Sequence, residues 1–491
     1  MSASPIDLFL RMPESIVGSP AQASRFARRT VLSLIILALL TAGTFGPLLA
    51  RMVNNVVLQK RMRGIPQVEV AAPTDYGAHS LLAELMRVTG RPVVPHPAYH
   101  IMLLGVQMGV ERFGNSAPQP APQNVTVEDL RQAVLANRWP VLAVIARKYR
   151  VAAITVSLFW CEALAGMLYL LIRRQLPPMV VWGDALAVAL SWMMMIVAPI
   201  IALASFDQRY YLGYIGLNVL HNPTMIVVKP LALLWFCWAV FTFPADERSS
   251  AGIDPTSHDR RPTWPVIFGV ALLAMLATLS KPSYTICILP AVSLCAAWRL
   301  LRGGRVRWTV LFAGMIVPAT AVLLWQYHWQ YNQAAHTING KTYRIVFHPL
   351  AAVSSWSQHV IWKGVLSVVF PATVAVIYAP ETWRSVRLRL AWLVFAVASI
   401  QFYLIAEEGR EADGNFTWGA QIALFILFAE SVMLILRRDR LFATCAEKSK
   451  PRYAIPWRLA LCTTAFACHV AAGIYYYHHV LTGNRALNFF G

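Results

Sequence analysis

The sequence has few charged residues and few of the motifs that mark soluble enzymes. Of its 491 residues only 13% are charged while 57% are hydrophobic, and the mean hydropathy is +0.51. This balance excludes intrinsic disorder and most classes of soluble globular protein. Walker, GxGxxG, GxSxG and HExxH motifs are absent, so ATP-driven transport, dinucleotide chemistry and hydrolase chemistry find no support. The seven cysteines form no CxxC pair, so no disulfide framework or zinc site is indicated.

Long apolar stretches occupy most of the chain. A spanning helix needs roughly 20 mostly apolar residues, and the stretches are continuous, whereas the strands of a membrane β-barrel alternate apolar and polar residues. The sequence therefore predicts an all-α polytopic membrane protein, with 1–491 as a single integral membrane domain. Eleven candidate spans can be drawn, at 31–50, 150–172, 180–203, 224–243, 264–280, 284–300, 308–326, 359–379, 390–406, 418–436 and 458–476.

Acidic residues are scarce, with 23 Asp and Glu against 43 Lys and Arg and a net charge of +20. In a membrane protein such an excess more often reflects the positive-inside rule than nucleic-acid binding. With the N-terminus inside, the inner segments carry 23 Lys and Arg and the short outer segments carry 6. The long first outer loop, 51–149, is set aside because long loops translocate largely regardless of charge. We therefore expect a cytoplasmic N-terminus, an external C-terminus and no nucleic-acid partner.

The first outer loop contains two amphipathic segments. Residues 79–88 place apolar side chains at helical spacing, and 126–139 do the same after Thr126, a plausible N-cap. A Pro-rich linker, 114–123, lies between them. We expect two helices lying in the membrane interface; the alternative is a small globular loop domain.

Polar residues beside membrane spans are costly and often functional, and here they gather on the predicted outer side. Asp75 lies in TDYGAHS, just before the first amphipathic segment. Its carboxylate can accept a proton from an acceptor hydroxyl or can simply cap the following helix. His79, His96 and His100 lie in the same loop, but Pro97 interrupts the last pair. The histidines therefore predict no metal site.

The segment HNPT, 221–224, opens the fourth span. Asn222 suits the N-cap and Pro223 the first helical position, and a helix N-terminus at the outer surface favours anions. Lys229 follows within about two turns of helix. Its ammonium either reaches outward to the membrane surface or meets a lipid phosphate.

Two further outer segments carry candidate ligands. Lys281 lies in the tight turn LSKPSY, while Arg410 and Asn415 lie in EEGREADGNFTWG, which is unusually rich in charge. Each is either a binding residue or an ordinary solvated loop residue. Inside the spans, Glu430 is predicted to be paired across helices and Lys363 to extend toward the membrane surface.

This layout resembles the GT-C superfamily of membrane glycosyltransferases. The resemblance is carried by Asp75 in the first outer loop, by RPVVPHPAYH after it, and by HNPT and LSKPSY. It implies a bacterial inner (cytoplasmic) membrane enzyme that moves a sugar from a polyprenyl-phosphate carrier to a lipid- or glycan-linked acceptor at the outer face. It implies no cofactor, and Asp75 lacks the acidic neighbour that many members carry, so no metal is predicted.

The resemblance also assigns roles to the candidate residues. Asp75 would be the general base. The carrier phosphate would contact Lys229, Lys281 and Arg410. The remaining substrate-binding residues would be His79, His96, His100, Asn222 and Asn415.

Two other functions fit a polytopic membrane protein. A polysaccharide polymerase or ligase would use a pyrophosphate-linked glycan and rely on arginines in a large late outer loop, but 327–358 holds only Lys341 and Arg344. A lipid or solute transporter would favour inverted repeats and broken helices, which the sequence does not display.

Overall fold

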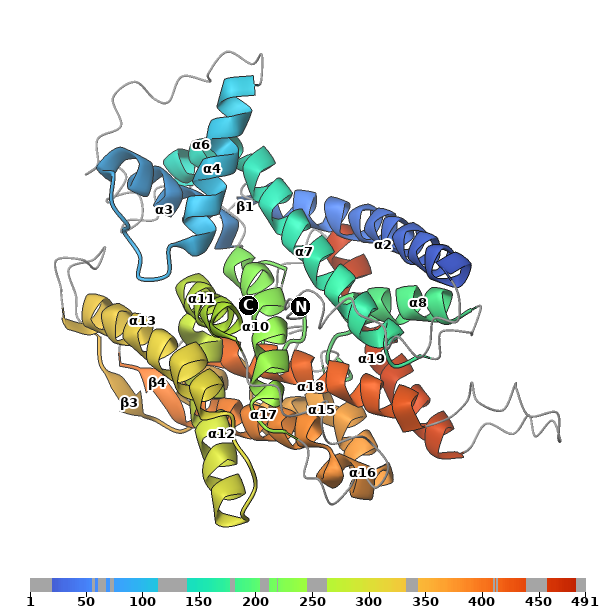
Figure 1. The fold of residues 1–491 in the computed structure, drawn as a ribbon. Coiled ribbons are helices and arrows are strands. Elements are labelled where there is room, and N and C mark those ends of the chain that lie inside the picture. Colours follow the sequence, from blue (N-terminus) through green and yellow to red (C-terminus); the bar gives the residue numbers. More distant parts are fainter. Residues whose placement is uncertain are drawn as a thin grey trace.

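The computed structural model describes most of the chain, and most of the described residues are helical (Figure 1). Two predicted features lie outside the described residues: the helix expected at 126–139, of which only Trp139 is described, and the site residue Arg410. The described ranges are 20–54, 58–60, 68–70, 75–113, 139–176, 182–203, 212–218, 220–244, 263–332, 343–408, 411, 414–438 and 457–482.

Nine helical segments in the described ranges are long and apolar enough to cross a membrane. They show that the protein is an integral, polytopic, mainly α-helical membrane protein, as the sequence predicts, and each overlaps one expected span. They are α2 (Pro20–Asn54), α7 (Arg150–Arg173), α10 (Pro223–Phe241), α12 (Pro282–Leu301), the continuous run of η4 (Val310–Ile316), α13 (Val317–Tyr327) and η5 (His328–Asn332), α15 (Val360–Ile377), α17 (Val386–Leu404), α18 (Thr417–Arg438) and α19 (Trp457–Thr482).

Two expected spans are shorter apolar helices, α8 (Gly183–Ile196) and α11 (Trp264–Ser280). The helix predicted over 180–203 stops at Ile196 because Pro199 disfavours helical backbone in the residue before it. The chain beyond is held instead by α19, where Ala198 N donates to His469 O at 3.1 Å.

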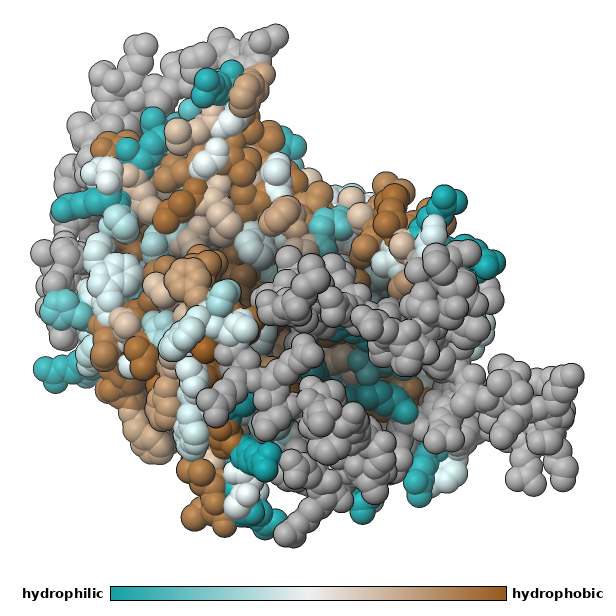
Figure 2. Space-filling view, in the orientation of Figure 1, coloured by the Kyte–Doolittle hydropathy of each residue, from teal (hydrophilic) through white to brown (hydrophobic). Residues whose placement is uncertain are grey.

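The centre of the bundle is α18. Its spanning window is 94% buried, whereas the window of α2 is only 28% buried. Several large apolar side chains of α2 are exposed, and Leu39 is 69% exposed. Hydrophobic residues cover broad areas of the described surface (Figure 2). An apolar exterior of this extent is what a lipid-facing surface requires.

Charged groups inside the bundle are paired or buried. Arg387 of α17 donates to both oxygens of the fully buried Glu430 of α18, at 2.5 and 2.8 Å, which confirms the predicted cross-helix pair. Lys363 is also fully buried, and its Nζ donates to Leu212 O at 3.1 Å. The prediction that Lys363 reaches the membrane surface is therefore wrong, because a backbone carbonyl satisfies its ammonium inside the protein.

The segment predicted as the first outer loop contributes a separate group of helices at one end of the molecule (Figure 1). The predicted helix at 79–88 lies within α3 (Asp75–Thr89), and it contacts α4 (Ala98–Phe113) and α6 (Trp139–Lys148). The sequence analysis missed α4, which in turn contacts α7, α10 and α11. A backbone hydrogen bond from Asp75 N to His221 O, at 3.1 Å, brings the beginning of α3 to the beginning of α10.

Short elements complete the described fold. One antiparallel pair joins β1 (Leu58–Lys60) to β2 (Val68–Val70), and another joins β3 (Ile345–Phe347) to β4 (Ile405–Glu407). The second pair links the outer loop predicted at 327–358 to the end of the span predicted at 390–406. Two short helices are α14 (Ala351–Ser354) and α16 (Ala379–Arg384).

Candidate active site

A continuous chain of hydrogen bonds joins Asp75 to Lys281. Asn222 Nδ2 donates to Asp75 Oδ2 at 2.6 Å, and Thr224 Oγ1 donates to Asn222 Oδ1 at 2.6 Å. Lys281 Nζ then donates to Thr224 Oγ1 at 3.0 Å. We call these four residues the Asp75–Lys281 chain. It places a carboxylate and an ammonium at the two ends of one fixed polar array.

Local helix chemistry fixes the middle of this chain. Asn222 is the N-cap of α10, where its Oδ1 accepts from Thr224 N at 3.1 Å and Met225 N at 3.2 Å, and Pro223 occupies the first turn. Both features were predicted from HNPT. Because the cap occupies Oδ1, the carboxamide has one orientation and its Nδ2 is directed at Asp75.

Four helices begin at this place. Asp75 starts α3, and its N–H donates to His221 O at 3.1 Å; Asn222 caps α10, and Lys281 is the N-cap residue of α12. The first turn of α18 adds Trp418, whose ring lies 4.7 Å from Lys281 Nζ. Each helix N-terminus carries the equivalent of about half a positive charge. Together with the ammonium they make this end of the bundle suited to an anion.

Lys281 is 7% exposed. Burial lowers its pKa to about 8, and the nearby Asp75 carboxylate opposes that shift. Lys281 therefore remains mainly protonated at pH 7 and titrates at a pH far below that of an ordinary lysine.

The histidine cluster, made of His79, His96 and His100, lies next to the chain. His79 Nδ1 and His100 Nε2 share a hydrogen bond of 2.9 Å, and the His96 and His100 rings lie 6.5 Å apart. Burial, followed by the charges of His100 and Lys281, lowers the pKa of His79 well below its usual value. Burial also lowers the pKa of His96 to about 3 and that of His100 to about 4. The cluster is thus uncharged at neutral pH and offers neutral hydrogen-bonding groups beside the cation.

Trp418 was missed by the sequence analysis, and His221 appeared there only as the first residue of HNPT, without a role. The His221 ring lies 6.0 Å from that of Trp418, and burial followed by Lys281 lowers the pKa of His221 to about 3. Gly419 permits this arrangement, since a Cβ there would lie 2.6 Å from Ser283 O of α12. A tryptophan next to glycine at the start of an apolar run is the signal that the sequence offered.

Lys229 and Asn415 lie outside the chain. Lys229 Nζ donates to Leu217 O and, at 3.1 Å, to Asn218 Oδ1, and the side chain is 4% exposed. These contacts join α10 to the preceding segment, so its predicted part in phosphate binding gains no support from its partners. Asn415 Nδ2 donates to Glu407 Oε2 at 2.7 Å, and Asn415 O accepts from Ser283 Oγ at 3.4 Å. Asn415 is therefore close to the start of α12, and its described hydrogen bonds are to Glu407 and Ser283.

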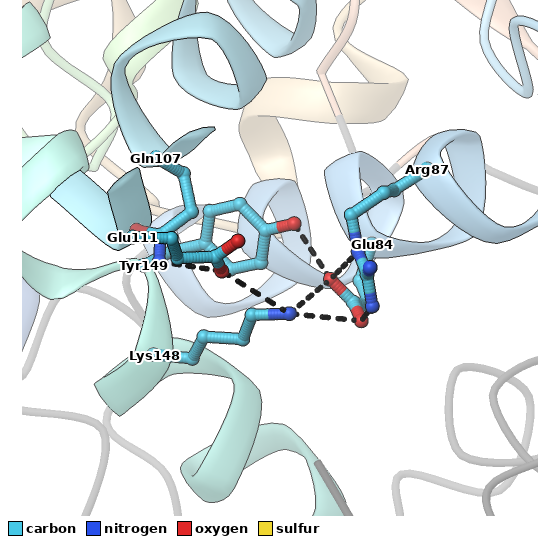
Figure 3. A network of polar contacts seen from close by, with 6 residues as sticks. All are labelled: Glu84, Arg87, Gln107, Glu111, Lys148 and Tyr149. Atoms are coloured by element: carbon cyan, nitrogen blue, oxygen red, sulfur yellow. Dashed lines mark hydrogen bonds and ion pairs between the residues drawn. The ribbon is translucent and has the colours of Figure 1, made fainter. Parts of the chain in front are cut away.

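Glu84, the other acid of α3, is committed to a structural network (Figure 3). Tyr149 OH donates to its Oε2 at 2.6 Å, and Lys148 Nζ donates to both oxygens at 3.1 and 3.2 Å, while Arg87 forms an ion pair with it. Burial would raise the pKa of Glu84, but hydrogen bonds from Arg87, Tyr149 and Lys148 outweigh it and lower the pKa to about 2. The network ties the far end of α3 to the α6–α7 junction.

The described residues contain no group of three or more His, Cys, Asp and Glu side chains arranged to hold a metal ion. No family model, curated protein or solved structure matches the chain. The chemistry must therefore be argued from the site alone.

Proposed function

We propose that the protein is a membrane glycosyltransferase that moves a sugar from a polyprenyl-phosphate carrier to a lipid- or glycan-linked acceptor at the outer face. One observation carries the proposal: the Asp75–Lys281 chain holds a carboxylate and an ammonium on a rigid array at the start of four helices. The reaction needs those two groups, a base for the acceptor and a cation for the leaving phosphate.

In the proposed reaction Asp75 takes the proton of the acceptor hydroxyl. The acceptor oxygen forms a bond to the anomeric carbon, while the bond from that carbon to the phosphate oxygen breaks and leaves its electron pair on the phosphate. The hydrogen bond from Asn222 holds the carboxylate in place. No acid is needed at the leaving group, because a phosphate is already a stable anion.

The phosphate is assigned to Lys281 and the adjoining helix N-termini. The α12 terminus makes no side-chain capping hydrogen bond, so its first N–H groups can meet an anion. Lys229 is not assigned to this step, because its ammonium joins α10 to the preceding segment through Leu217 O and Asn218 Oδ1 and has no contact with the Asp75–Lys281 chain among the described hydrogen bonds. The histidine cluster beside Lys281 is left for the uncharged parts of the substrates.

A donor screen tests the proposal. The full chain, reconstituted in liposomes, would be given radiolabelled polyprenyl-phosphate sugars, polyprenyl-pyrophosphate oligosaccharides and a crude lipid and glycan acceptor fraction. We expect label to pass only from the phosphate-linked donors. Transfer only from pyrophosphate donors would identify a polymerase or ligase, and movement of lipid across the bilayer without transfer would identify a transporter.

A further inference from the structure

Trp418, in the first turn of α18, supplies an aromatic face to the Lys281 ammonium. Lys281 Nζ lies 4.7 Å from the centre of the Trp418 ring, inside the distance of about 6 Å at which an indole face attracts a cation. The same Nζ donates a hydrogen bond to Thr224 Oγ1 at 3.0 Å. An ammonium carries three N–H groups, so these two described contacts hold two sides of it and leave one N–H for a ligand.

Close packing at the start of α18 fixes the indole in this place. A Cβ on Gly419 would lie 2.6 Å from Ser283 O in α12, so the two helices approach as closely as glycine permits. On the other side of the indole residue, Thr417 Oγ1 donates to Gly414 O at 2.7 Å and ties the start of α18 to the turn before it. Because Lys281 is the N-cap residue of α12, the packing of α18 on α12 also sets the distance between ring and ammonium.

The indole counteracts the effect of burial on Lys281. Burial lowers the pKa of Lys281 to about 8, because a charged group is costly away from water. The negative face of an indole attracts an ammonium but not a neutral amine, so Trp418 favours the charged form. A second carboxylate in this place would do the same, but it would repel a phosphate. A neutral ring therefore keeps the cation available to an anion.

We propose that Trp418 is a positioning residue of the candidate active site, whose ring directs the Lys281 ammonium at the carrier phosphate and keeps it charged. The inference rests on the assignment of the phosphate to Lys281 in the proposed function. Trp418 acts through Lys281 and need not touch the phosphate itself. Its loss should therefore weaken phosphate binding most at a pH where Lys281 is close to losing its proton.

Other described ionisable groups lie within electrostatic range of Lys281. They are Asp75 and His79 of α3, His96 before α4 and His221 before α10. Burial lowers the pKa of all three histidines far below neutrality, and aspartate side chains ordinarily titrate in acid. A change in phosphate affinity between about pH 7 and pH 9 therefore reports the charge of Lys281.

Fluorinated tryptophans test the proposal while the shape of the side chain stays nearly constant. Each fluorine withdraws electron density from the ring and so weakens its attraction for a cation. The full chain in detergent micelles would carry tryptophan with no, one, two or three fluorine atoms at position 418. Its affinity for farnesyl phosphate would be measured from about pH 6 to about pH 9. Ratios to the unmodified protein at each pH cancel the titration of the phosphate itself.

We expect the pH at which the affinity falls to move downward with each fluorine, and farthest in Trp418→Leu, which removes the aromatic face. The contact of a desolvated ammonium with an indole is worth about one pKa unit. Trp418→Leu should then bind farnesyl phosphate about fivefold more weakly than the wild type at pH 8 and almost equally well at pH 6. A purely structural role of the ring predicts no such dependence on pH.

Fluorination of Trp235 is the matched control. Trp235 lies in α10 and is fully buried, and its described ring contact is with Tyr284 of α12, with 6.0 Å between the ring centroids. It thus joins two helices of the site through an aromatic partner instead of a cation. Its fluorination should leave the pH dependence of binding unchanged.

Two outcomes would overturn the inference: fluorination at position 418 leaves the affinity unchanged at every pH, or it weakens binding by the same factor at every pH. The fluorinated series decides the question even if Trp418→Leu folds poorly, because its side chains keep nearly the size of tryptophan. Failure of the unmodified protein to bind farnesyl phosphate, or an affinity that Lys281→Met leaves unchanged, would instead contradict the proposed function.

Discussion

Asn222 serves the fold and the site at once, and two substitutions separate these roles. Asn222→Ala removes the cap of α10, worth about 1 kcal/mol, and the hydrogen bond to the Asp75 carboxylate, worth about 1.5–3 kcal/mol. We expect the free energy of unfolding to fall by about 3 kcal/mol. Asn222→Asp keeps the capping oxygen but sets a second carboxylate where Nδ2 lies 2.6 Å from Asp75.

The two carboxylates of Asn222→Asp cannot both ionise at that distance, so they share a proton. Sharing raises the folded-state pKa of the pair above the unfolded value. The variant should therefore be close to wild type in acid and lose stability as the pH rises through that pKa, whereas Asn222→Ala should be about equally destabilised throughout.

Equilibrium unfolding in mixed detergent micelles across a pH series measures both effects. Thr263→Ala is the control, because Thr263 caps α11 without a side-chain hydrogen bond and its loss should cost less than about 0.5 kcal/mol. The reasoning is refuted if Asn222→Ala matches the wild type, or if Asn222→Asp is as unstable as Asn222→Ala with no dependence on pH.

Three further predictions concern charge. Glu84→Gln should lower the free energy of unfolding by about 2–3 kcal/mol at neutral pH. It should also reduce the loss of stability that the wild type shows between about pH 5 and pH 2, because the folded-state pKa of Glu84 is lowered to about 2. Acid unfolding curves that coincide for the two proteins would contradict this. The affinity for farnesyl phosphate should begin to fall near pH 8, where Lys281 of the unliganded protein loses its proton. Lys281→Met should abolish that fall. If the affinity does not change up to pH 10, the assignment of Lys281 to the phosphate is wrong. Cysteines placed in 244–263 should resist labelling from outside intact cells while those in 477–491 react, and the reverse pattern would invert the predicted topology.

The sequence was sufficient to predict the helical membrane architecture and much of the candidate site. Apolar runs of spanning length identify helices regardless of tertiary context. Asn222 caps a helix by local chemistry, and Lys281 lies in a turn that Pro282 marks in the sequence. Asp75 joins them because α3 begins where α10 begins. The sequence analysis missed α4 because a segment rich in Pro and His precedes it, and the helix starts at Ala98, directly after Pro97.

The sequence could not show which way each side chain points within the bundle. Lys229 and Lys281 are both lysines near the outer ends of predicted spans, yet one donates to a backbone carbonyl of the protein and the other to Thr224 beside Asp75. Trp418 lies in an apolar run, where periodicity assigns it to the core. Only the tertiary fold brings its ring to Lys281.

The most direct test of the account is the turnover of Asp75→Asn with a defined polyprenyl-phosphate donor and acceptor. General-base assistance is worth about 10²–10⁴ in rate, so we expect a loss of that size with unchanged expression and farnesyl phosphate binding. Glu408→Gln, which changes an exposed acid in the segment after α17, should retain wild-type activity. Near-wild-type turnover by Asp75→Asn would show that another acid is the base and that the Asp75–Lys281 chain is not the catalytic centre.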